Sequence, residues 1–175
     1  GFYGWPYANG NGVADPDFGA DKPDLVAKTR VPVHAFAAHN APLGIAFIRG
    51  THFPPDYRGA AVVALHGSWN RSSPDGYKVV SLHWTADGIE ERDFLTGFNQ
   101  DGNISGRPVD VAQGPDGAIY ITDDYAGAIY RVSYGAPGNG NSAPIALPAE
   151  DRLDAQPPVW LAGADMAIMA SHGSK

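Results

Sequence analysis

Cysteine is absent from this 175-residue sequence, which excludes both a disulfide framework and a thiolate metal site. Clusters of lysine and arginine are also absent and the formal net charge is −7, so the chain lacks the basic stripe that neutralises nucleic-acid phosphates. No stretch approaches the about 20 consecutive apolar residues that a membrane-spanning helix needs. The sequence therefore predicts neither a nucleic-acid partner nor a membrane span, and any anion site has to be local.

Turn-forming residues are abundant instead, with 22 glycines and 15 prolines beside 43% hydrophobic residues. Short apolar runs bounded by Gly, Pro and Asp predict β-strands. The predicted strands are 43–48, 60–66, 77–84 and 88–94, and then, where the pattern restarts, 109–113, 118–122 and 128–134. We therefore predict an all-β fold of about two to three four-stranded antiparallel sheets, arranged as blades of a β-propeller.

The predicted domain organisation is a set of blades over residues 1–134, which includes a long ordered loop at 1–42, and a Gly/Pro/Ala-rich C-terminal tail over 135–175. Two or three blades cannot close a ring, and they would leave an apolar sheet face open to water. The chain also starts at Gly1 within an aromatic turn motif. We therefore expect a complement, which is a missing N-terminal half, a second polypeptide or another copy of the chain.

The candidate binding residues lie at predicted strand ends. The segment His-Gly-Ser-Trp-Asn-Arg at 66–71 supplies His66, Asn70 and Arg71, and Arg107 precedes the strand at 109–113. Two guanidinium groups and an imidazole suit a carboxylate-bearing ligand. The alternatives stay open, because arginines are commonly surface residues and a strand-end histidine is often satisfied by the backbone.

Two further side chains are weaker candidates for substrate binding. His39 lies in a loop that leads into a blade, and Asp123 follows a predicted strand, although Asp123 and Asp124 also suit a turn-capping role. We assign no metal, because the histidines are scattered and the aspartates of 15–24 do not match a calcium-loop spacing.

Several segments together resemble the C-terminal half of the PQQ-dependent glucose and sorbosone dehydrogenase family, of the soluble aldose sugar dehydrogenase type. These segments are 2–6, 23–28, 41–47, 57–59, 66–71, 76–80, 93–98 and 106–111. The resemblance runs from Gly1 to about Ser133 in the same order. It implies a partial ring of a six-bladed propeller that uses pyrroloquinoline quinone (PQQ) to oxidise a sugar hydroxyl or aldehyde.

The resemblance also implies roles for individual residues. We expect Arg71, Arg107, His66 and Asn70 to contact PQQ, while the general base and the calcium ligands of the family belong to motifs that this chain does not contain. The chain alone is then incomplete for catalysis. A periplasmic or secreted location follows from the resemblance only.

Two other functions stay open from the sequence. One is a calcium-dependent sugar-lactone hydrolase, a second propeller chemistry, and the other is a non-catalytic propeller module that binds protein partners.

Overall fold

The computed structural model describes residues 1–135, which fall into two compact units, Gly1–Ala37 and a second that begins at Ala38. The predicted tail at 135–175 lies outside the described residues except for Gly135. None of the helices within residues 1–135 is long and apolar enough to cross a membrane.

The first unit is a small assembly of turns. Strands β1 (Ala8–Asn9) and β2 (Val13–Ala14) pair as an antiparallel hairpin, and η1 (Gly19–Asp21) and α1 (Pro23–Ala27) follow. Pro23 begins α1, where its missing N–H costs no hydrogen bond. The sequence predicts this region as loop, because two-residue strands and a one-turn helix leave no periodic pattern.

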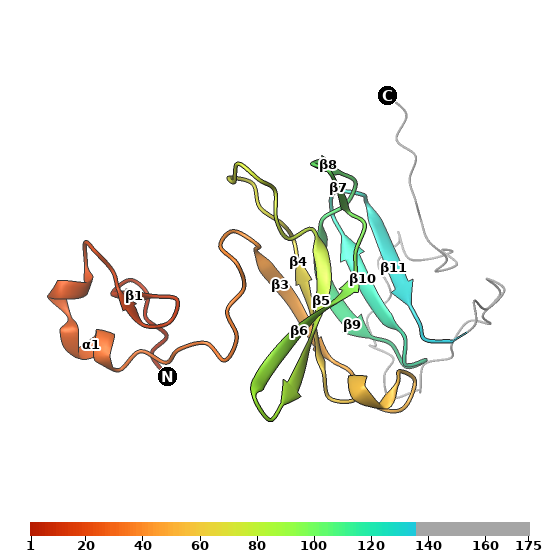
Figure 1. Ribbon diagram of the computed structural model, residues 1–175, viewed down its shortest axis with the longest axis horizontal. Helices are drawn as coiled ribbons and strands as arrows, with labels where there is room; N and C mark the ends of the chain where they lie inside the picture. Colours follow the sequence, from red (N-terminus) through yellow and green to blue (C-terminus); the bar gives the residue numbers. More distant parts are fainter. Residues whose placement is uncertain (136–175) are drawn as a thin grey trace, which may run out of the picture. The chain divides into compact units, whose positions relative to one another are not determined.

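The second unit contains two antiparallel sheets (Figure 1). The four-stranded sheet has the order β3-β4-β5-β6, and the three-stranded sheet has the order β11-β10-β9. Their strands are β3 (Pro42–Phe47), β4 (Ala61–Leu65), β5 (Lys78–Thr85), β6 (Gly88–Leu95), β9 (Pro108–Gln113), β10 (Ile119–Asp123) and β11 (Ala128–Val132). Each of the seven predicted strands coincides with one of these, so the prediction of an all-β meander is confirmed.

Short elements complete the second unit. The 3-10 turn η2 (Pro55–Tyr57) lies between β3 and β4, and the hairpin of β7 (Asn99–Gln100) and β8 (Asn103–Ile104) joins the two sheets in sequence. The Asn99 side chain accepts a hydrogen bond from the Gly102 amide and closes the hairpin turn.

The hydrophobic core lies between the two sheets. It joins β4 and β5 to β9 and β10 through the buried residues Ile48, Phe53, Val62, Ala64, Val79, Val111, Ile119 and Ile121. Strand β4 is buried along its whole length, which fits a central strand of apolar residues. The two sheets therefore pack face to face as neighbouring blades.

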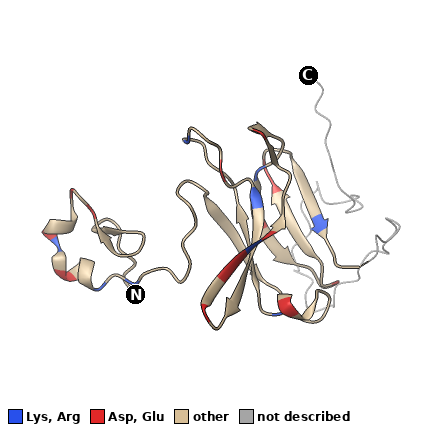
Figure 2. Ribbon diagram, viewed as in Figure 1, with Lys and Arg blue, Asp and Glu red and all other residues tan. Residues whose placement is uncertain are grey.

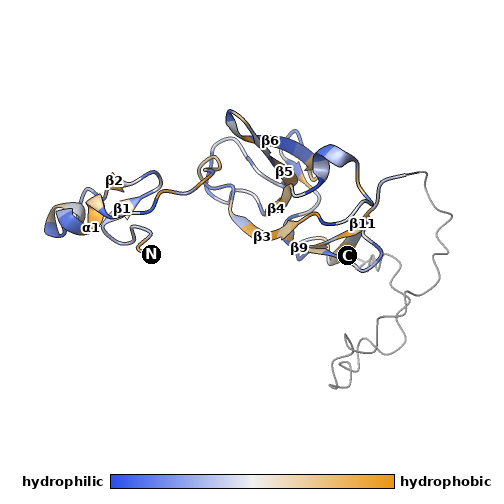
Figure 3. Cartoon of the chain, turned by 90° about the horizontal axis from the view of Figure 1, so that it is seen from below, coloured by the Kyte–Doolittle hydropathy of each residue, from blue (hydrophilic) through white to orange (hydrophobic). Residues whose placement is uncertain are grey.

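The four-stranded sheet has a charged edge and a partly exposed apolar face. Charged residues line its β6 edge (Figure 2), where Glu90, Glu91, Arg92 and Asp93 discourage pairing with another strand. Strand β3 carries hydrophobic residues (Figure 3). Leu43, Ile45 and Phe47, on the sheet face turned away from the core, are about half exposed, and Phe47 contacts Trp84 of β5 with ring centroids 5.8 Å apart. This half-exposed set is the open apolar face.

Candidate functional site

The loop between β4 and β5, residues 66–77, forms one wall of the candidate site. Its ends fold together because the Ser68 amide donates to the Asp75 carbonyl, the Asp75 amide donates to Ser68 Oγ, and the Tyr77 hydroxyl donates to the Ser68 carbonyl. Gly67 has φ 93°, and a Cβ there would lie 2.5 Å from the buried Tyr77 ring. The loop is therefore a closed unit that tolerates only glycine at position 67.

Arg107 fastens this loop to the neighbouring sheet. It precedes the first residue of β9, and its Nε and Nη2 donate to the carbonyls of His66 (3.1 Å) and Gly67 (2.9 Å). Its guanidinium carbon lies 5.5 Å from the centroid of the Tyr77 ring, within cation–π range. Two of its five N–H groups are used in this way, and within residues 1–135 its Nη1 makes no hydrogen bond.

Asp123, the last residue of β10, is 3% exposed and holds the Arg107 backbone in place. Its carboxylate accepts from the amides of Arg107 (3.0 Å) and Ala126 (2.8 Å) and from the Tyr130 hydroxyl (3.3 Å). Burial, reinforced by the charge of Asp123, raises the pKa of Tyr130 above its usual value. These bonds give Asp123 a structural role as a turn cap, and its contact with substrate stays a prediction.

The carboxylate that does reach solvent is that of Asp124. Its Oδ1 lies 3.0 Å from His66 Nε2, and the side chains of Asp124 and His66 are 65% and 19% exposed. The hydrogen bond with His66, aided by the charges of His66 and Arg107, lowers the pKa of Asp124 below its usual value. The structure therefore pairs His66, a predicted binding residue, with Asp124, for which the sequence indicates a turn-capping role.

Arg71 lies on the same loop but makes different contacts. Its Nη1 donates to the Ala38 carbonyl at 2.8 Å and lies 3.5 Å from the Asp75 carboxylate. Arg71 and Arg107 donate to different segments, the Ala38 carbonyl and the carbonyls of His66 and Gly67, and their joint contact with one ligand stays a prediction. Asn70 is exposed beside Arg71.

Residues 39–41 run alongside this loop. His39 and Ala41 have φ values of 67° and 48°, and Asn40 between them is 5% exposed. The carbonyls of Asn40 and Ala41 accept from the amides of Gly67 and His66, respectively. The Asn40 side-chain oxygen is buried without a partner. Predicted residue His39 is exposed and so remains accessible to a ligand.

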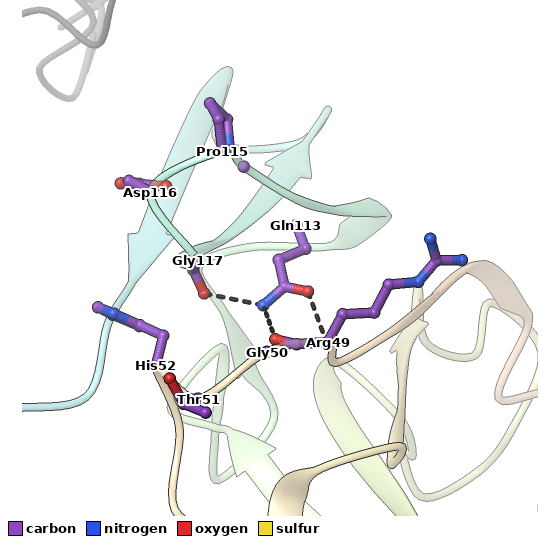
Figure 4. A pocket seen from close by; sticks show the side chains of 9 residues that line it. Arg49, Gly50, Thr51, His52, Gln113, Pro115, Asp116 and Gly117 are labelled. Atoms are coloured by element: carbon purple, nitrogen blue, oxygen red, sulfur yellow. Dashed lines mark hydrogen bonds between the residues drawn. The ribbon is translucent and has the colours of Figure 1, made fainter.

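The opposite end of the two sheets carries an open pocket (Figure 4), which no sequence motif indicated. Gln113 at the end of β9 accepts from the Arg49 amide at 2.7 Å and donates to the carbonyls of Arg49 and Gly117. Nearby, burial raises the pKa of Asp116, but hydrogen bonds that include one from Arg131 outweigh it and leave this pKa lowered. Since these polar groups bond to one another, the pocket residues join the two sheets.

The described residues contain no group of three or more His, Asp or Glu side chains arranged to hold a metal ion. The aspartates of the first unit serve local structure instead, since Asp15 accepts hydrogen bonds from the amides of Asp17 and Phe18.

Comparison with known proteins agrees with this architecture. The model of the TrAA12-like family matches residues 26–135. The chain is 41% identical over 136 residues to an uncharacterized protein of Borreliella burgdorferi, an alignment that covers 75% of this chain and 36% of that protein. It is 34% identical over 122 residues to a pyrroloquinoline quinone-dependent pyranose dehydrogenase of Coprinopsis cinerea, over 58% of this chain and 16% of that protein.

A solved structure supports the same fold. The iodide structure of a Trichoderma reesei enzyme of carbohydrate-active enzyme family AA12 superposes with a TM-score of 0.53 at 22% identity, over 66% of this chain and 31% of that one. The chain spans 36% and 16% of the length of the two relatives named above.

Proposed function

The chain belongs to the TrAA12-like family, and from this premise we propose that it forms part of the wall of a PQQ site in a sugar-oxidising dehydrogenase. The relative from Coprinopsis cinerea is named for PQQ dependence and for a pyranose substrate. The observation that carries the proposal is Arg107, a cation fixed at a strand end beside His66, whose Nη1 makes no hydrogen bond to any of residues 1–135.

The hydrogen-bond donors at this end of the sheets match the chemical groups that PQQ carries. PQQ carries three carboxylates and an ortho-quinone, so its site needs fixed cations and hydrogen-bond donors. Arg107 and Arg71 supply guanidinium N–H groups. At about 4 Å and an effective dielectric constant near 20, each contact between unit charges gains about 4 kcal/mol before desolvation is subtracted. An acidic chain can therefore hold an anion at this place.

Each predicted residue then has a defined part. Arg107 and Arg71 would bind cofactor carboxylates, and Asn70 would bind cofactor oxygens. His66 would bind a cofactor oxygen or the substrate hydroxyl, and His39 would contact the sugar. PQQ, when bound, supplies the hydride acceptor for oxidation of the sugar. The general base and the calcium ligands are not assigned to residues of this chain, so we propose that catalysis needs further protein.

The open apolar face indicates what that further protein is. Leu43, Ile45, Phe47 and Trp84 present a half-exposed strip on the side of the sheet that points away from the neighbouring blade. Apolar strips of this kind mark interfaces, and the chain spans little more than a third of its Borreliella burgdorferi relative. We assign this face to another propeller blade that belongs to the remaining length of such a protein. A periplasmic or secreted location is part of the same proposal.

The alternative of a sugar-lactone hydrolase requires Glu, Asn and Asp side chains around one central ion, and no observation within residues 1–135 favours it over the proposal. A non-catalytic module is the remaining alternative, and the binding experiment decides it.

The test is calorimetric titration of PQQ, with calcium present, into the protein as its gene encodes it. We expect saturable binding that Arg107→Gln weakens at least tenfold, and that Arg107→Lys weakens less because it keeps the charge but loses the planar fork. Asp87→Ala, in the exposed turn between β5 and β6, is the matched control and leaves binding unchanged. Absence of PQQ binding, or equal binding by wild type and Arg107→Gln, would overturn the proposal.

A further inference from the structure

His66 is held more firmly than a strand-end surface residue. Its amide donates to the Ala41 carbonyl at 3.1 Å, its carbonyl accepts from Arg107 at 3.1 Å, and its ring Nε2 lies 3.0 Å from Asp124 Oδ1. The backbone and one ring nitrogen are therefore fixed by three separate segments. Such fixation is what a binding group with a defined direction requires.

The chemistry of the pair decides where the proton of the neutral ring lies. An ionised carboxylate only accepts hydrogen bonds, so His66 Nε2 must carry the N–H in the 3.0 Å contact with Asp124. In a neutral imidazole the other nitrogen is then unprotonated. His66 Nδ1 is therefore an acceptor when the pair is formed by the neutral ring.

This acceptor is not completely buried. Only two buried side-chain polar atoms in residues 1–135 lack a partner, Asn40 Oδ1 and His52 Nε2, and His66 Nδ1 is not one of them. No hydrogen bond within the described residues uses His66 Nδ1 either, and the His66 side chain is 19% exposed. A ligand hydroxyl can reach it.

We propose that Asp124 is a positioning residue that fixes the Nε2–H tautomer of His66, so that His66 Nδ1 accepts a hydrogen bond from a hydroxyl of a sugar ligand. This inference rests on the proposed function and adds a residue to it. The charged group that acts on the pair is Arg107, which directly precedes β9. Arg107 favours the ionised form of Asp124, which keeps the carboxylate an acceptor.

The tautomer is measured directly by long-range proton–nitrogen NMR of the histidine rings above neutral pH, with His66→Gln to assign the signals. We expect an unprotonated Nδ1 and a protonated Nε2. This tautomer is favoured about tenfold or more over the other, because its Nε2–H donates a hydrogen bond to a charged acceptor. Asp124→Ala removes this preference, whereas the control Asp87→Ala keeps it. A protonated Nδ1 in the wild type, or the same tautomer ratio in wild type and Asp124→Ala, would overturn the inference.

A second measurement uses the protein as its gene encodes it, loaded with PQQ and assayed with D-glucose. Asp124→Ala is expected to lower kcat/KM about tenfold, mainly through KM, while the affinity for PQQ stays within twofold of wild type. An unchanged kcat/KM contradicts the inference. If PQQ does not bind to the wild type, the proposed function fails, and the NMR result still reports on the tautomer by itself.

Discussion

Replacing Asp123 with alanine removes a hydrogen-bond acceptor that joins three parts of the fold. These are the residue before β9, the turn that follows β10, and strand β11. Three donors lose their partner, the amides of Arg107 and Ala126 and the hydroxyl of Tyr130. A buried donor left without a partner costs about 1–3 kcal/mol, and partial access of water at this strand end lowers the sum. We expect Asp123→Ala to reduce the free energy of unfolding by about 3 kcal/mol.

Urea denaturation followed by circular dichroism measures this loss. With an m-value of about 1.5 kcal/mol/M, the midpoint falls by about 2 M and the slope does not change. The exposed Asp87→Ala is the control, and its stability is expected to stay within about 0.5 kcal/mol of wild type. A loss of less than about 1 kcal/mol for Asp123→Ala would refute the view that Asp123 holds the Arg107 backbone.

Three other perturbations test separate contacts. Gly67→Ala places a Cβ 2.5 Å from the Tyr77 ring at a positive φ, so we expect a loss of about 2–4 kcal/mol in the same urea assay, and wild-type stability would contradict it. Gln113→Ala removes the two hydrogen bonds to Arg49 that join the two sheets, and one to Gly117 within the turn between β9 and β10. The expected loss is about 2 kcal/mol, and an unchanged midpoint would count against this link. His66→Gln is expected to raise the pKa of Asp124 toward its usual value in a carbon NMR titration. Because the fold lowers this pKa, the contribution of Asp124 to stability is complete above about pH 4 and is lost as the pH falls further. An identical titration of Asp124 in wild type and His66→Gln would contradict the pairing.

Most strands of the second unit were predictable because they are short runs, rich in apolar residues, that Gly, Pro or Asp bound, whereas β6 carries four consecutive charged residues. Strand β4, Ala61–Leu65, is the clearest instance, since its five apolar residues are all buried. The hairpin of β7 and β8 was not predictable in this way, because two-residue strands show no alternation. Its turn also depends on a hydrogen bond that the Asn99 side chain accepts from the Gly102 amide. The same reason explains the missed elements of the first unit.

The placement of His66 and Arg107 at strand ends could be read from the sequence, whereas their partners could not. The strand alternation of β10 distinguishes Asp123 from Asp124. Ile119, Ile121 and Asp123 share one buried face of β10, so alternation places Asp123 inside and Asp124 beyond the strand. The bond between His66 and Asp124 joins residues 58 positions apart in sequence, and no local pattern records such a contact.

The central claim is that Arg107 belongs to a PQQ site. Its most direct test is a crystal structure of the protein as its gene encodes it, in complex with PQQ. The account predicts a PQQ carboxylate within hydrogen-bond distance of the Arg107 guanidinium, about 2.7–3.2 Å, with the bonds from Arg107 to the His66 and Gly67 carbonyls retained. PQQ bound away from the loop at 66–77, with Arg107 in contact only with these carbonyls, would contradict it.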